Sequence, residues 1–344
     1  MYEIHLSQDD GNGWDQMVSE CSDASYAHLF GWKGVVERAY ANPCYNFECW
    51  GKPGLVGILP MVHLKSRLFG NHFVSMPYLD CGGPLFTDPG ACQSLLAEAT
   101  SKAGALGASV CVRSMREGIL DWKAQTEKVT MHLSLQSDPE AMLKKFSSER
   151  RNRIKKAAKN GLTVSFQREE GLDVFYRIFS ENMRDLGSPV HSKRFFREIL
   201  ATFQRETGVV IVNDPKGDSI GAGLFLRFKE LLALPWVSCL RHTFKLNPNI
   251  ILYWELIKRG CETGAMTFDF GRSTKGSGTF EYKRQWGAEP VPLFWYQQPC
   301  SDLNGGSSLD SKSAKNQAMI ALWKKLPLCI ANGVGPMLRK SISL

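Results

Sequence analysis

FDFGRSTKGSGTFEYKRQWG, residues Phe268–Gly287, decides how the second half of the chain folds. It overlaps the short apolar segment Met266–Phe270, whose one charged residue is Asp269, and this pattern predicts a buried strand. A polar turn with two glycines follows, and Thr279–Trp286 predicts two helical turns that end before Gly287. The strand, turn and helix place five polar side chains close together, namely Asp269, Arg272, Glu281, Lys283 and Arg284. We expect the chemistry of the protein in this stretch.

Lys283 falls in the last turn of the short helix. A lysine at this position complements the negative end of the helix dipole, which is a structural role. The alternative is a fixed cation that stabilises oxyanion charge developing during acyl transfer. Asp269 and Arg272 flank the preceding turn and form either a structural ion pair or a substrate clamp. Together with Glu281 and Tyr282 of the helix, they are the predicted substrate-binding residues.

A second stretch, Met142–Asn160, is the most charged part of the chain and carries eight lysines and arginines against the single acid Glu149. Its apolar stripe through Phe146 and Ile154 predicts a helix that docks on a core and exposes its charges. Like charges on one helix repel, by a few tenths of a kcal/mol for each i,i+4 pair. Either an anionic partner offsets that repulsion, or solvent and salt screen it. The predicted anion-binding residues are Arg150, Arg151, Arg153, Lys155 and Lys156.

Strand and helix patterns run in a similar mixed order through both halves of the chain, although no residue-level repeat is visible. This order predicts an α/β (α+β) fold with two tandem domains, each a mixed β-sheet flanked by helices. We place an N-terminal domain at 1–125 and a C-terminal domain at 126–298. A flexible linker is expected at 299–316, which is rich in Ser, Asp, Asn, Gly and Lys, and a C-terminal tail at 317–344.

The tail contains the segment Pro327–Leu344, which is apolar, interrupted by Gly and Pro, and basic near Arg339 and Lys340. Such a segment either covers a groove of the body or touches a membrane surface weakly. In the first half, the loop Pro77–Pro84 reads PYLDCGGP, and its glycines permit a close approach of the backbone to another group.

Composition limits the classes of function. With 344 residues, 43% hydrophobic and 22% charged, the chain has the profile of a globular protein with substantial cores. Its net charge of +8 favours phosphate-bearing partners such as RNA, nucleotide-linked substrates or anionic lipid. Ten scattered cysteines without a CxxC pair indicate reduced thiols and no metal site. The chain shows no signal-peptide pattern and no run of about 18 apolar residues, so a cytoplasmic location is expected.

Common catalytic signatures are absent from the sequence. It contains no G-x-S-x-G elbow, no Walker-type phosphate loop, no G-x-G-x-x-G after a strand and no HExxH. The seven histidines occur singly. We assign no general base, because substrate groups can take the proton themselves.

Three motifs resemble the Fem family, whose members use aminoacyl-tRNA to add amino acids to cell-wall precursor peptides. They are FDFG at Phe268–Gly271, the F-x-Y-K-x-x-W-G run at Phe280–Gly287, and the basic ERRNRIKKAAKNGL at Glu149–Leu162. The tail pattern WKKLP…GP at Trp323–Pro336 is similar to that of Fem-like (FemAB-like) proteins associated with exosortase and exopolysaccharide loci. The resemblance covers the last two-thirds of the chain well and the first third loosely.

This resemblance implies two GNAT-type domains and acyl transfer to an amine. It implies that Lys283 matches the family lysine that stabilises the developing oxyanion or contacts the acyl donor. No tightly bound cofactor is implied. The acyl donor would be aminoacyl-tRNA or acyl-CoA, and the amine-bearing acceptor would belong to cell-envelope or exopolysaccharide biosynthesis.

Two alternatives remain open. One is an acyl-CoA-dependent GNAT N-acyltransferase, a class that normally holds the CoA pyrophosphate in a Q/R-x-x-G-x-G/A turn before its long helix. The corresponding segment here, Leu240–Ile250, reads LRHTFKLNPNI and contains no glycine. The other is a non-catalytic protein whose basic helix binds RNA or another anionic polymer. The expected location is cytoplasmic, with peripheral contact to the inner membrane through the tail.

Overall fold

The computed structural model describes residues 2–8, 11–52, 54–298 and 314–343. Most of the linker expected at 299–316 lies outside these residues. The described chain divides into two compact units. The first unit holds residues 2–128, 292–298 and 338–343, and the second holds residues 129–291 and 314–337.

The first unit is built on a mixed sheet with the strand order β1-β2-β3-β4-β6-β15-β7, and β5 pairs with β3. The strands are β1 (Glu3–Leu6), β2 (Cys44–Trp50), β3 (Leu55–Ser66), β4 (Gly70–Val74), β5 (Leu85–Phe86), β6 (Ser109–Ser114), β7 (Ala124–Gln125) and β15 (Phe294–Gln298). Strands β2 and β3 form an antiparallel hairpin. The chain leaves this sheet after β7 and returns to it as β15, which pairs with both β6 and β7.

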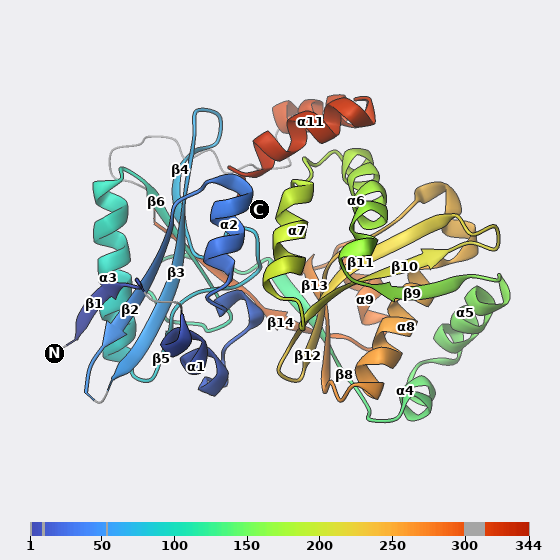
Figure 1. The fold of residues 1–344 in the computed structure, drawn as a ribbon, viewed down its shortest axis with the longest axis horizontal. Helices are drawn as coiled ribbons and strands as arrows, with labels where there is room; N and C mark the ends of the chain where they lie inside the picture. The colour runs from blue at the N-terminus through green and yellow to red at the C-terminus, as the bar shows by residue number, and fades with distance from the viewer. Residues whose placement is uncertain (1, 9–10, 53, 299–313, 344) are drawn as a thin grey trace. The chain divides into compact units, whose positions relative to one another are not determined.

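Helix α3 (Pro89–Ala105) covers one face of the first sheet, whereas α1 (Asn12–Glu20) and α2 (Trp32–Tyr40) lie on the other (Figure 1). Helix α3 begins at Pro89 because the Asp88 carboxylate accepts hydrogen bonds from the N–H groups of Gly90 and Ala91. Its buried alanines and leucines pack against apolar side chains of β2, β3 and β6. A short 3₁₀ helix, η1 (Tyr26–His28), joins α1 to α2.

The second unit contains a seven-stranded sheet with the order β14-β8-β13-β12-β11-β10-β9. Its strands are β8 (Lys128–Ser134), β9 (Thr163–Gln167), β10 (Thr207–Asn213), β11 (Ser219–Phe228), β12 (Leu231–Cys239), β13 (Thr267–Thr274) and β14 (Glu289–Pro292). Strands β10, β11 and β12 form a meander, since they pair in antiparallel order. Strand β13 then pairs with β12 in parallel, after the helical crossover that such a connection needs.

Helices lie on both faces of the second sheet (Figure 1). One face packs on α8 (Pro248–Glu262), whose side chains join the apolar residues of β8, β12 and β13 in one core. Helices α4 (Pro139–Lys145), α5 (Ser148–Lys159) and α9 (Gly278–Arg284) belong to the same side. The other face carries η2 (Glu169–Gly171), α6 (Leu172–Leu186) and α7 (Lys193–Thr202), and η3 (Arg241–Leu246) leads into α8.

The single helix expected across Met142–Asn160 is wrong in one respect, because the structure divides this stretch between the end of α4 and α5. Phe146 leaves the helical conformation, and the Ser147 hydroxyl then accepts a hydrogen bond from the Arg150 N–H at 3.2 Å. A serine competes for main-chain donors in this way and therefore favours the start of a helix over its interior. The break sets the direction in which α5 presents its charges.

Residues 314–343 contain two helices, α10 (Ala314–Trp323) and α11 (Leu328–Arg339). Within the second unit they pack on α6 and the segment that follows it. The Arg184 guanidinium donates to the Leu326 carbonyl at 3.2 Å, and the Asn332 amide donates to the Ser180 hydroxyl at 3.3 Å. Among the described helices, none has the length and hydropathy that crossing a membrane would need.

Candidate functional site

The ladder between the parallel strands β12 and β13 ends in the middle of both strands. Their three registered pairs in the described sheet are Leu231↔Thr267, Leu232↔Phe268 and Ala233↔Asp269. Beyond them, Pro235 has no N–H to donate, and Gly271 has a φ of +74°, a left-handed conformation that suits glycine. Both features interrupt regular pairing. The polar residues expected from the sequence lie at this point, and open α/β sheets commonly bind ligands beyond the carboxyl ends of such strands.

Asp269 is buried, with 5% of its surface exposed, and faces away from α8. Its neighbours Phe268 and Phe270 belong to the core on the α8 side, and side chains alternate along a strand. One carboxylate oxygen accepts hydrogen bonds from the Thr130 hydroxyl at 2.5 Å and from the Gly271 N–H at 2.8 Å. The carboxylate is therefore held in one orientation.

The second oxygen of Asp269 lies 3.8 Å from Nε2 of His132 on β8. This distance is within ion-pair range and longer than a hydrogen bond. The His132 side chain is 27% exposed, against 7% for that of Asp269. A partly exposed imidazole beside a fixed carboxylate is an arrangement suited to accepting a proton, because the carboxylate stabilises the imidazolium that forms.

Lys283 lies in the last turn of α9, as expected, and is buried. Its Nζ donates hydrogen bonds to the carbonyls of Gly271 at 2.8 Å and Arg272 at 2.9 Å. The ammonium therefore holds the main chain of β13 two residues beyond Asp269. Helix α9 is positioned for this contact by Ser277, whose hydroxyl accepts from the Phe280 N–H at 3.3 Å. The contacts give Lys283 a structural role, and its catalytic role stays a prediction.

The other predicted substrate-binding residues differ in their settings. Arg272 is half-buried, and its carbonyl is one of the two that Lys283 binds. Glu281 is exposed and lies 3.7 Å from Arg284 of the same helix. The Tyr282 ring packs against the α8 core, and burial raises the pKa of its hydroxyl to about 12. Tyr282 therefore remains a neutral hydroxyl at physiological pH.

Arg150 is set apart from the other predicted anion-binding residues because it is 2% exposed. Its guanidinium lies 4.4 Å from the centre of the Trp286 ring and 5.4 Å from that of Tyr282, and it donates to the Gln285 side chain at 3.0 Å. Burial lowers its pKa, although an arginine stays charged. Arg150 therefore connects α5 to the end of α9 from inside the unit.

The remaining basic residues of α4 and α5 form a solvent-facing surface, which we call the α5 basic face. Its exposed members are Lys144, Lys145, Arg153, Lys155, Lys156 and Lys159. Arg151 is half-buried and donates to main-chain carbonyls at the α4–α5 break, including that of Lys144 at 3.2 Å. Arg153 pairs with Glu149 at 2.8 Å. The surface thus keeps a strong excess of positive charge.

The α5 basic face continues into the start of α8. The Asn160 amide donates to the Leu246 carbonyl at 2.9 Å and so fixes the end of α5 beside η3. Exposed Arg241, His242 and Lys245 lie on η3. Asn247 precedes α8 in a left-handed conformation and makes no side-chain cap. The first turn of α8 thus adds its helix dipole to a cationic surface, which is the chemistry that phosphate groups select.

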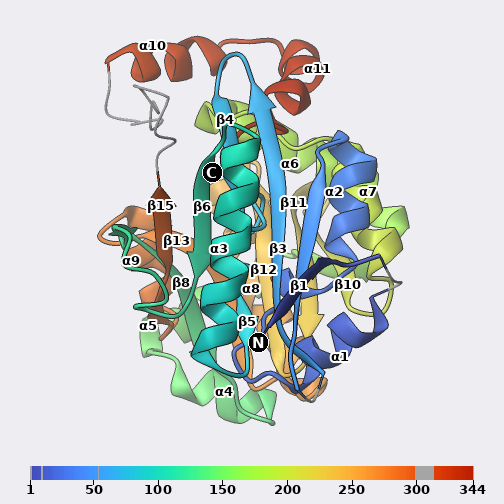
Figure 2. The ribbon, with the colours of Figure 1, turned by 90° about the vertical axis from the view of Figure 1, so that its left-hand side faces the viewer.

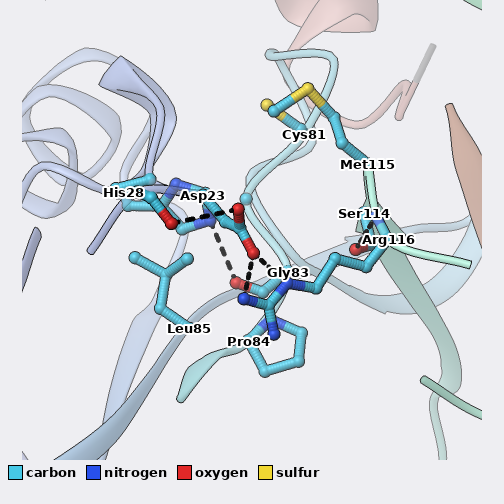
Figure 3. A pocket seen from close by; sticks show the side chains of 12 residues that line it. Asp23, His28, Cys81, Gly83, Pro84, Leu85, Ser114, Met115 and Arg116 are labelled. Atoms are coloured by element: carbon cyan, nitrogen blue, oxygen red, sulfur yellow. Dashed lines mark hydrogen bonds and ion pairs between the residues drawn. The ribbon is translucent and has the colours of Figure 1, made fainter. Parts of the chain in front are cut away.

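The first unit contains a pocket of about 220 Å³ beside the loop PYLDCGGP (Figure 3). Its walls are residues 22–24 after α1, residues 81–85 of the loop, residues 114–116 after β6, and His28. An ion pair between Asp23 and Arg116 lies at one side of it. The loop glycines Gly82 and Gly83 form part of this wall. Gly82 has a φ of +143°, a conformation that favours glycine.

His28 is fully enclosed behind this pocket and uses both ring nitrogens. Nε2 lies 3.1 Å from the Gly83 carbonyl, which can only accept, so Nε2 carries the proton. Nδ1 accepts from the Ser25 N–H at 3.0 Å, and the Ser25 hydroxyl lies 3.1 Å from the Cys81 thiol. Burial lowers the pKa of His28 to about 4, so the ring is neutral. It joins η1 to the loop at Gly83.

His132 is the residue of this site that sequence reasoning missed. Side chains alternate along a strand, so Thr130 and His132 lie on one face of β8. That signal was available, but the neighbour of this face depends on β8 lying beside β13, which no local pattern shows. Asp269 and Lys283, by contrast, share one continuous motif. Within the described residues, no group of three or more His, Cys, Asp or Glu side chains could hold a metal ion.

Residues 144–284 match the family model described as an acetyltransferase (GNAT) domain. The match runs from α4 to the end of α9, and so it contains the β12–β13 separation, Asp269 and Lys283. A search of curated protein sequences finds no match to the chain.

Several solved structures share the fold at low sequence identity. FemX is 14% identical with a TM-score of 0.65, over 94% of this chain and all of that chain. L-PGS from Bacillus licheniformis is 12% identical with a TM-score of 0.54, over 94% of this chain and 98% of that one. A tandem GNAT protein from the clavulanic acid biosynthesis pathway is 10% identical with a TM-score of 0.54, over 86% and 98%.

The matched domain and the shared fold define the class: the protein is an acyltransferase with a GNAT domain at residues 144–284. More particularly, it has the tandem, Fem-like form of that fold, with a mixed sheet in each unit. The fold class predicted from the sequence is therefore confirmed, and so is the resemblance to the Fem family, whereas the link to exosortase and exopolysaccharide loci stays a prediction.

Proposed function

We propose that this protein transfers an aminoacyl or acyl group from an anionic carrier to an amine at the end of the β12–β13 ladder. The observation that carries the proposal is the fixed Asp269 carboxylate beside the partly exposed His132, 3.8 Å apart. Asp269 lies inside the matched acetyltransferase (GNAT) domain, two residues before the main-chain carbonyl of Gly271 that Lys283 binds, whereas His132 precedes the matched residues. A second, independent support is the cationic surface of α5 and η3.

In this mechanism the acceptor amine attacks the carbonyl carbon of an ester or thioester donor. A C–N bond forms and the C–O or C–S bond breaks. His132 takes the proton from the amine and returns it to the leaving oxygen or sulfur, while Asp269 orients the ring and stabilises its charged form. Holding both substrates at one site supplies much of the remaining rate.

Lys283 contributes positive charge to the same place in the proposal. Its ammonium polarises the peptide groups of Gly271 and Arg272, whose carbonyls it binds at 2.8 and 2.9 Å. A cation fixed before the reaction stabilises developing negative charge without reorganising. Arg272 and the exposed Glu281 are proposed to contact substrate, while Tyr282 supports α9 from the core side.

The α5 basic face and η3 are proposed to hold the donor. The η3 segment lacks the glycines with which GNAT domains wrap a CoA pyrophosphate, and the cationic surface extends along α5, well beyond one pyrophosphate. Both observations favour aminoacyl-tRNA over acyl-CoA. The structural likeness to FemX and L-PGS supports an acceptor from the cell envelope, and the tail pattern WKKLP…GP supports one from exopolysaccharide biosynthesis.

The first experiment separates the two donors and the non-catalytic alternative. We expect charged tRNA to raise the melting temperature and to transfer its radiolabelled aminoacyl group to an amine acceptor, whereas acetyl-CoA does neither. The double variant Lys155→Glu, Lys156→Glu should weaken tRNA binding by about tenfold or more, because phosphate contacts are lost.

The matched control is Arg197→Glu, Arg205→Glu, which reverses two exposed charges on α7 and after it, on the opposite face of the sheet. It should bind tRNA as the unchanged protein does. Stabilisation by acetyl-CoA alone would assign the donor to CoA. Tight RNA binding without transfer, by protein that remains folded, would support the non-catalytic alternative.

A further inference from the structure

Helices α10 and α11 expose large apolar side chains at an unusual density. Twelve such side chains are exposed in the described chain, and five of them lie within residues 314–343. These five are Met319 at 50%, Leu322 at 66%, Ile330 at 47%, Val334 at 41% and Met337 at 68%. We call them the apolar surface of α10–α11. Exposed apolar side chains gathered in one place mark an interaction surface.

The helices that carry this surface are docked on the second unit. In α11, Ile330, Val334 and Met337 follow a spacing of four and three residues, so they share one side of the helix. Ala331 and Gly335 are buried on another side. A Cβ at Gly335 would lie 3.2 Å from the Val190 main-chain nitrogen, so the helix packs there against backbone. The exposure therefore belongs to a packed amphipathic helix.

The charged residues of the segment that carries the apolar surface all have one sign. Residues 311–344 contain no Asp or Glu and six basic residues, which are Lys312, Lys315, Lys324, Lys325, Arg339 and Lys340. The whole chain has a net charge of +8, so this short segment holds most of the excess. Lys324 and Lys325 are exposed between the two helices, and Lys340 is exposed just after α11.

We propose that α10 and α11 dock this protein on the surface of an anionic lipid bilayer. Cations attract the acidic headgroups, and the apolar side chains enter the boundary between headgroups and acyl chains. Figure 2 shows that α10 and α11 follow one another end to end. An RNA surface would complement the lysines but offers no apolar layer for Leu322 or Met337, so lipid is the better match.

The test is flotation of the full chain with vesicles of phosphatidylcholine alone or of equal parts phosphatidylcholine and phosphatidylglycerol. We expect binding to the anionic vesicles, weakened by salt. The variant Leu322→Glu, Met337→Glu should lower the bound-to-free ratio by about tenfold or more. It removes apolar groups that would enter the bilayer, and it adds charges that the anionic headgroups repel. Lys324→Glu, Lys325→Glu should do the same. The control Leu68→Glu changes a side chain that is 74% exposed in the first unit and should leave binding within about twofold.

All four changed positions, two on the helices and two between them, are exposed, so the variants should melt at the temperature of the unchanged protein. Equal binding to both vesicle types, or unchanged binding of either double variant, would overturn the proposal. The proposal would also be overturned if the protein did not bind vesicles but bound RNA, and if this RNA binding required Lys324 and Lys325 but was unchanged in Leu322→Glu, Met337→Glu. Aminoacyl transfer in vesicle-free solution is independent of this contact, so failure here leaves the acyltransferase proposal standing.

Discussion

His28 and His132 are the same residue type in opposite settings. In the first unit, His28 is enclosed, neutral, and bonded through both nitrogens to main-chain groups of Gly83 and Ser25. In the second unit, His132 is partly exposed and lies near a buried carboxylate that other donors already hold. Burial and saturated hydrogen bonding make an imidazole part of the framework. Partial exposure beside a fixed anion instead leaves His132 open to a substrate, as the proposed mechanism requires.

The largest effect should come from removing the second of these rings. His132→Ala is expected to lower the rate of aminoacyl transfer by about 10²- to 10⁴-fold, the range for losing a general base. Because the His132 side chain is partly exposed, the melting temperature of the variant protein should change little. His28→Ala, the matched variant, should instead destabilise the protein by leaving buried groups of Gly83 and Ser25 without partners. Transfer assays and thermal melts on both variants make the measurement. Full activity of His132→Ala would contradict the proposed role of His132.

The second effect is a loss of stability in acid that depends on His28. Its pKa in the folded protein is about 4, lower than the ordinary value of 6.5. The folded state thus favours the neutral ring, and the unfolded chain binds the proton first as pH falls. This contribution is complete above about pH 6.5 and is lost progressively down to about pH 4, by roughly 3 kcal/mol in total.

Urea unfolding between pH 4 and pH 7 would measure it, with His28→Gln as the reference. The free energy of unfolding of the unchanged protein should fall more steeply with acid than that of the variant. Parallel pH profiles would show that His28 titrates in the folded protein as freely as in the unfolded chain, and would remove the contrast with His132.

The sequence predicts features that lie within one continuous stretch and does not predict those that depend on contacts between distant segments. The motif at 268–287 contains Asp269, the turn, the Ser277 cap and Lys283 in one continuous stretch, so local patterns predict their proximity. The pairing of β8 with β13, which brings His132 to Asp269, and the return of β15 to the first sheet depend on long-range packing. The burial of Arg150 is equally invisible, because charge alone predicts exposure and only the Trp286 ring beneath the guanidinium explains its position.

The smallest effect concerns Lys283, which combines both kinds of role. Lys283→Met keeps the buried stem but leaves the carbonyls of Gly271 and Arg272 without their ammonium donor, and should cost about 1–3 kcal/mol of stability. Chemical denaturation measures that loss, and transfer assays below the melting temperature measure activity separately. If the ammonium also stabilises the oxyanion, transfer falls in protein that is still fully folded. Full activity in such protein would restrict Lys283 to the framework, like His28, and leave the Asp269–His132 pair to account for catalysis.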